Sequence, residues 1–196
     1  MNKTLLALLL ATATSSSAAQ SGSSLSGLSV SGTVAGSVPS QARVAGFVLD
    51  GSGTPFSELV SVPVNGRKFS LDLPSVLPPQ KALSALRSDS IFWPGLLEPV
   101  HVSGQVSAAD LRFYLYADSN GNGRRDPGEP LQEAVPFVGR SVLVVSFASG
   151  AAQVTAARGF QADLKAGWNG LLIEVGRTVK VTVGNSVSGV VLNTQR

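Results

Sequence analysis

Cysteine is absent from the 196-residue chain, and histidine occurs once, at His101. The lack of thiols excludes disulfide bridges, a thiolate metal site, a cysteine nucleophile and a lipid-modified cysteine. Without cysteine or a second histidine, the usual zinc ligand sets are excluded as well. His101 stands in a short stretch that alternates like a strand, facing away from its valine neighbours, so we expect it at the surface and not in a catalytic site.

The sequence also has little that indicates catalysis or nucleic-acid binding. Its many serines include no G-x-S-x-G nucleophile elbow. Charged residues make up 14% of the chain, and three of its 12 acidic residues fall in one short loop, which leaves few for a pair of catalytic acids. The net charge of +3 comes without the clustered Lys/Arg face that nucleic acids require. We therefore expect neither an enzyme nor a nucleic-acid-binding protein.

Long apolar runs are missing too, apart from a short one near the N-terminus. Lys3 precedes an apolar core at residues 5–11, and small residues lead to a cleavage position after Ala19. This pattern predicts a signal peptide over residues 1–19, because the core is too short to span a bilayer. A buried N-terminal helix is the alternative, but the serines that follow give it nothing to continue into. We expect an exported protein, periplasmic or at the cell surface, without a membrane span in the mature chain.

What the sequence contains in abundance is two-residue alternation. Residues 20–27 are rich in Ser and Gly and predict a flexible leader. Beyond them, apolar and polar residues alternate at 28–34, 68–73 and 178–183, as in half-buried strands. We therefore expect an all-β fold over residues 28–196, an antiparallel β-sandwich of the Ig-like or prealbumin-like kind.

Two finer features of this fold also follow from the sequence. Residues 42–49 and 141–147 are apolar on both faces, which is typical of central strands. Residues 81–87, after two prolines, favour a short helix. A weak internal similarity leaves open whether the chain is one compact domain or two lobes that meet near residues 103–108, and we favour a single domain with two lobes.

The strongest motif is the twelve-residue stretch 118–129, Asp-Ser-Asn-Gly-Asn-Gly-Arg-Arg-Asp-Pro-Gly-Glu. It matches the calcium-loop pattern D-x-[DN]-x-[DN]-G-x5-E at every specified position, with oxygen-bearing side chains at positions 1, 3, 5, 9 and 12. Calcium takes six to eight oxygen ligands, and alternating ligands with a glycine at position 6 allow the chain to wrap around the ion. The pattern thus indicates a Ca²⁺ site.

The surroundings of this loop differ from those of an EF-hand, in which two helices flank it. Residues 111–116 alternate and are rich in aromatics, which predicts a strand before the loop. Pro127, Pro130 and Pro136 disfavour a helix after it, because proline removes a backbone donor and clashes with the preceding turn. We therefore predict a strand–calcium loop–strand element.

Residues 113–131, with Val135, resemble the calcium-binding B-type repeat domains of bacterial surface adhesins, over about residues 111–135. Those domains are small β-sandwiches in which such a loop binds calcium and rigidifies the module. We expect a non-catalytic module of structural or adhesive function, with a protein or a glycan of the cell envelope as partner. It also implies a ligand set in which Arg124 contributes only its backbone carbonyl: Asp118, Asn120, Asn122, Arg124, Asp126 and Glu129.

Two alternatives remain open. Asn-Gly and Pro-Gly pairs also build plain polar turns, so the loop can be a turn without metal. Trp93 and Trp168 stand beside turn signals, where an exposed indole would bind a sugar ring and a buried one would cap the core; we favour the core. If the loop binds calcium, its two Asn ligands and neighbouring Arg pair predict weak affinity, on the order of 0.1–1 mM.

Overall fold

The computed structural model describes residues 24–194, which form fourteen strands and two short 3₁₀ helices. The strands are β1 (Leu28–Ala35), β2 (Ala42–Leu49), β3 (Pro55–Pro63), β4 (Lys68–Leu73), β5 (Ser84–Ala85), β6 (His101–Ser103), β7 (Ser107–Ala117), β8 (Gln132–Val138), β9 (Ser141–Ala148), β10 (Ala152–Ala156), β11 (Phe160–Leu164), β12 (Gly167–Val175), β13 (Val179–Gly184) and β14 (Ser186–Thr194). The helices are η1 (Gln80–Ala82) and η2 (Ala157–Gly159). The prediction of an all-β fold is confirmed.

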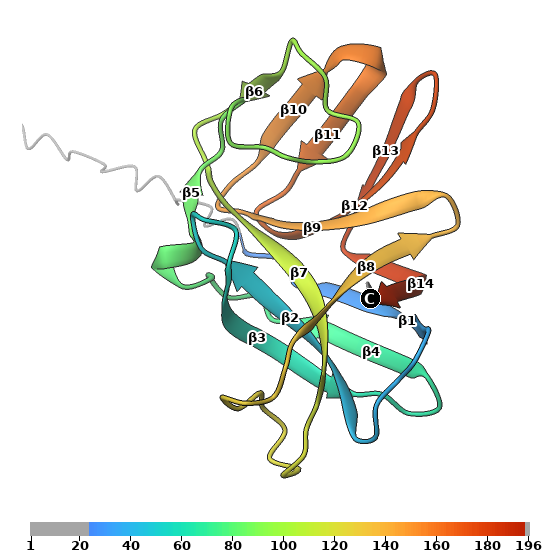
Figure 1. Cartoon of the computed structure of the whole chain (residues 1–196). Helices are drawn as coiled ribbons and strands as arrows, with labels where there is room; N and C mark the ends of the chain where they lie inside the picture. The colour runs from blue at the N-terminus through green and yellow to red at the C-terminus, as the bar shows by residue number, and fades with distance from the viewer. Residues whose placement is uncertain (1–23, 195–196) are drawn as a thin grey trace, which may run out of the picture.

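Strand β7 is the centre of the large sheet. Its second half pairs with β2 on one side and with β8 on the other, and its first half pairs with β9. From there the sheet continues through β9 to β12 and β13, and through β8 to β14, β1 and β4. A separate sheet of β11, β10 and β6 lies at the end of the molecule opposite the loop that joins β7 and β8 (Figure 1).

The large sheet is mixed, so the expectation of a purely antiparallel arrangement was wrong. Strands β1 and β14 run parallel, with Ser29 opposite Ser186 and Ala35 opposite Asn193. The alternation of each strand predicts its faces but not its neighbour, and here the first and last strands of the chain meet. The register shifts between Val30 and Gly32, where the backbone of β14 approaches closely.

Strands β9 and β12 separate two hydrophobic cores. On β9, Leu143, Val145 and Phe147 face the larger core, while Ala148 belongs to the smaller core under β10 and β11. On β12, Trp168 packs into the larger core and Leu171 into the smaller one. Burial on both faces explains why the sequence of β9 is almost continuously apolar, as expected of a central strand.

Other expectations are settled strand by strand. The alternation at residues 68–73 is confirmed, because β4 buries every second side chain. The helix expected over 81–87 was wrong: after the single turn of η1, Ser84 and Ala85 pair with β7, and this pairing outweighs local propensity. His101 is exposed in β6, as expected.

The N-terminal predictions concern residues that the structure largely does not describe. The signal peptide expected over residues 1–19, and the leader as far as residue 23, lie outside the described residues. In the remainder of the leader, the Ser26 N–H donates to the Ala166 carbonyl at 3.0 Å, and the Trp168 N–H donates to the Ser26 carbonyl at 2.9 Å. Residues 24–194 include no helix long and apolar enough to cross a membrane.

The close approach of β1 and β14 makes a testable prediction. A Cβ atom at Gly32 would lie 1.8 Å from the Val190 carbonyl oxygen, which only a backbone shift can relieve. We expect Gly32→Ala to destabilise the protein by at least about 3 kcal/mol in urea unfolding, the upper range for overpacking. Gly51→Ala is the control, because a Cβ there meets nothing within 4 Å. Equal stability of the two variants would contradict the parallel pairing.

Candidate metal centre

Loop 118–129 stands between the ends of two strands. β7 ends at Ala117 and β8 begins at Gln132, so no helix flanks the loop, in agreement with its prolines. The backbone N–H of Asp118 donates to the Gln41 carbonyl at 3.1 Å, which ties the start of the loop to the residue before β2. Figure 1 shows the loop projecting from the end of the molecule.

Hydrogen bonds from the backbone to side-chain oxygens set the path of the first half of the loop. The Gly123 N–H donates to Asp118 Oδ2 at 2.9 Å, the Asn122 N–H to Asn120 Oδ1 at 3.1 Å, and the Arg124 N–H to Asn122 Oδ1 at 2.8 Å. Gly123 has φ +80°, which glycine adopts without strain. The sequence pattern thus produces a series of turns closed by side-chain oxygens over residues 118–124.

The two C-terminal acids of the loop are held by hydrogen bonds as well. Glu129 Oε2 accepts the Asp126 N–H at 2.9 Å and Oε1 accepts the Ser119 N–H at 2.8 Å. These bonds, with that from Asp126 contributing most, hold the pKa of Glu129 below its ordinary value. Asp126 Oδ2 accepts the side-chain amides of Asn120 at 2.6 Å and of Asn122 at 2.7 Å. Four of the five predicted side-chain ligands, Asn120, Asn122, Asp126 and Glu129, are therefore linked to one another, whereas the Asp118 carboxylate bonds to the Gly123 N–H and pairs with Arg43.

Asp118 is the most deeply buried acidic residue of the loop. Asp118 is 4% exposed, and its Oδ1 is buried without a hydrogen-bond partner among residues 24–194. A buried acceptor without a partner costs about 1–3 kcal/mol, and a charged one costs more. The arrangement therefore leaves one carboxylate oxygen available to a cation.

The β2–β3 hairpin supports the loop through residues that the sequence motif does not include. Arg43 on β2 places its Nη1 at 3.6 Å from Asp118 Oδ2, and Ser61 on β3 donates to the Gly123 carbonyl at 2.9 Å. Glu58 Oε2 accepts the Arg125 N–H at 3.2 Å. The sequence carries one sign of this arrangement, because Arg43 is the single charge in the apolar stretch 42–49.

The oxygen donors of the loop fit a hard cation. Side-chain oxygens from the five predicted positions and the Arg124 carbonyl are the donor types that calcium prefers. Within residues 24–194, no group of three or more His, Cys, Asp and Glu side chains is arranged to hold a metal. The three carboxylates of the loop are thus not gathered into such a group, and a calcium site here would depend on the Asn amides and the Arg124 carbonyl as well.

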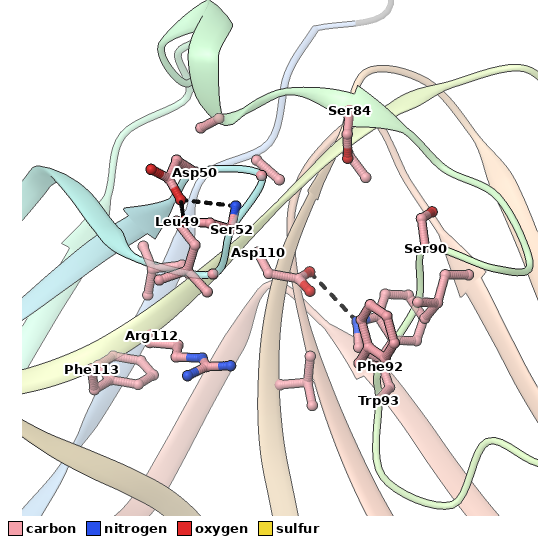
Figure 2. A pocket seen from close by; sticks show the side chains of 18 of the residues that line it. Leu49, Asp50, Ser52, Ser84, Ser90, Phe92, Trp93, Asp110, Arg112 and Phe113 are labelled. Carbon is pink, nitrogen blue, oxygen red and sulfur yellow. Dashed lines mark hydrogen bonds between the residues drawn. The ribbon is translucent and has the colours of Figure 1, made fainter.

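A second candidate site is a pocket of about 730 Å³ on the outer face of β7 (Figure 2). Asp110 and Arg112 of β7 point into it, and Phe92, which is 88% exposed, stands beside Trp93. Arg112 is paired with Glu133 at 3.2 Å, and the Trp93 indole N–H reaches Asp110 Oδ1 at 3.5 Å. The pocket thus combines an apolar wall with one partly buried carboxylate.

Both tryptophans are buried. Trp93 is 5% exposed and stacks on Phe160 with ring centroids 6.4 Å apart, and Trp168 is 1% exposed and packs edge-on against Phe147. They cap the cores, as the favoured interpretation expects. The alternative of an exposed indole platform for glycans lacks the exposed ring that it needs.

None of the protein-family models, curated proteins or solved structures with which the chain was compared matches it.

The pocket carboxylate generates a pH prediction. Burial raises the pKa of Asp110 above the ordinary 3.8, so the folded state holds this proton more tightly than the unfolded state. The stability linked to this proton is complete below the ordinary pKa of 3.8 and is lost as pH rises from there through the raised pKa of the folded state. We therefore expect Asp110→Asn, which stays neutral, to gain stability relative to the unsubstituted protein between about pH 3 and about pH 7 in urea unfolding.

Asp163 on β11 provides the control of opposite sign. Hydrogen bonds from the Gln153 side chain and then the Gln161 side chain lower the pKa of Asp163, so its contribution is present above the ordinary pKa and is lost as pH falls. Asp163→Asn should therefore lose stability relative to the unsubstituted protein over the same pH range. Parallel pH profiles for the two variants would contradict the burial of Asp110.

Proposed function

We propose that the chain is an exported, non-catalytic β-sandwich module of structural or adhesive function, in which loop 118–129 binds Ca²⁺. The ligands are those expected from the sequence, and the loop resembles that of the B-type repeats of surface adhesins. The large mixed sheet with a smaller sheet at one end is compatible with a sandwich. A protein or a glycan of the cell envelope is the expected partner.

The observation that carries this proposal is the buried Oδ1 of Asp118, which has no hydrogen-bond partner in the described part of the chain. Its position at the start of the loop corresponds to the first calcium ligand of the pattern. A polar turn without metal has no use for a buried, unpartnered carboxylate oxygen, because exposing that oxygen to water would be cheaper. The oxygen instead suits a divalent ion.

The effect of binding follows from what the loop connects. The loop is hydrogen-bonded to Gln41, the residue before β2, and to Ser61 and Glu58 of β3. Its C-terminal end leads directly into β8. Calcium, when bound, supplies positive charge to the carboxylates, whose mutual repulsion otherwise favours opening. Loop 118–129 would then hold the β2–β3 hairpin and the β7–β8 hairpin in a fixed position relative to each other. This rigidity suits a module that works outside the cell.

The test is thermal unfolding with EDTA, magnesium or millimolar calcium. A ligand of the folded state stabilises it by about 1.4 kcal/mol at roughly ten times its Kd. For a domain of this size, that corresponds to an increase in Tm of about 3–6 °C. We expect this increase with calcium and a much smaller one with magnesium, which tolerates departures from octahedral geometry poorly.

Variants assign the increase to the loop. Asp118→Ala and Glu129→Gln should each abolish the calcium-dependent increase in Tm. Asp50→Ala is the matched control, because Asp50 also organises a turn, accepting the Ser52 N–H at 3.0 Å and the Thr54 N–H at 3.1 Å. It should lower Tm in EDTA and leave the calcium increment intact. An increment that persists in both loop variants would falsify the assignment.

A further inference from the structure

We infer that Arg43 is a built-in counter-cation for Asp118, which stabilises the loop without calcium and weakens calcium binding. This inference rests on the proposed function, since it concerns the affinity of the same site. Its structural basis is the guanidinium of Arg43, which is held in a fixed position beside the buried carboxylate of Asp118. Arg43 belongs to β2, far in sequence from the loop, and no ligand pattern includes it.

The guanidinium of Arg43 is held in place by the neighbouring strand. Its Nε donates to Ser61 Oγ at 3.0 Å, and its Nη2 donates to the Ser61 carbonyl at 3.0 Å. The Ser61 hydroxyl accepts the Tyr116 hydroxyl at 3.2 Å, so it is fixed in turn. The Arg43 side chain is 17% exposed. Two bonds to one residue and little exposure prevent the charge from swinging into solvent.

The position of this charge makes it a competitor of the ion. Arg43 Nη1 lies 3.6 Å from Asp118 Oδ2, within ion-pair range, and its guanidinium is 3.8 Å from where a Cβ of Gly123 would stand. A cation bound by Asp118 would therefore meet a like charge across the same carboxylate. Two cations on one carboxylate repel each other, and partial burial reduces the screening of this repulsion by salt. Arg43 thus favours the calcium-free loop.

The experiment is calcium titration by isothermal calorimetry, with Arg43→Gln as the main variant. We expect calcium to bind about tenfold more tightly to Arg43→Gln than to the unsubstituted protein, a difference of about 1.4 kcal/mol. Arg43→Lys keeps the charge but cannot make both bonds to Ser61, so its calcium affinity should lie between those of Arg43→Gln and the unsubstituted protein. Arg140→Gln is the matched control, since it removes the same charge at the other end of β8, from a side chain that is 88% exposed. It should leave calcium affinity unchanged.

Unfolding in EDTA gives an independent readout. Without its counter-cation, Asp118 is a buried charge, so Arg43→Gln should lower Tm in EDTA more than it does in saturating calcium. Should Arg43→Gln fail to fold, Arg43→Met keeps the packing of the aliphatic stem and replaces it in both measurements. The inference is confirmed if Arg43→Gln binds calcium more tightly than the unsubstituted protein and if its loss of Tm is smaller in saturating calcium than in EDTA.

Failure of the inference is distinct from failure of the proposed function. If the unsubstituted protein binds calcium and Arg43→Gln binds equally or more weakly, Arg43 is a structural residue and the calcium site stands. If neither protein binds calcium, both proposals are overturned. If Arg43→Gln binds calcium and the unsubstituted protein does not, the counter-cation is confirmed and the native function as a calcium module is rejected.

Discussion

The buried carboxylate of Asp118 is the constraint on which the end of this molecule depends. A carboxylate removed from water must be compensated by hydrogen bonds and by positive charge. Here the Gly123 N–H and the Arg43 guanidinium meet one oxygen, and the other oxygen has no partner within residues 24–194. The turn of the loop provides the first contact and Arg43 of β2 provides the second, so the shape of the loop and the position of the hairpin are determined together.

The strand that carries Asp118 links this constraint to the rest of the fold. β7 pairs with β2, β8 and β9, so its end is fixed by neighbours on both sides. Tyr114 and Tyr116 on its outer face pack with Phe47 of β2 in a small cluster beneath the loop. Phe113 and Leu115 on its other face belong to the larger core. A strand buried on both faces gives the loop a rigid base.

The sequence predicts the local elements well and their assembly poorly. Alternation located β1, β4 and β13, and the prolines after residue 126 correctly excluded a helix, because both signals act over a few residues. The parallel pairing of β1 with β14 and the strand at Ser84 depend on partners far away in the chain. For the same reason the spacing of its residues identified the loop as a motif. Arg43, Ser61 and Glu58 were not identified, because they lie far from the loop in sequence.

The proposed weakness of the site has two physical sources that act together. Asn at positions 3 and 5 reduces the negative charge that the loop itself offers, and Arg43 neutralises part of what remains at position 1. A loop with its charges unopposed would bind calcium more tightly, but in its absence the carboxylates would repel one another and destabilise the fold. The proposed counter-cation would therefore lower the affinity for calcium and stabilise the calcium-free fold. That balance would suit the proposed exported module, which would have to fold before it reached calcium-rich surroundings.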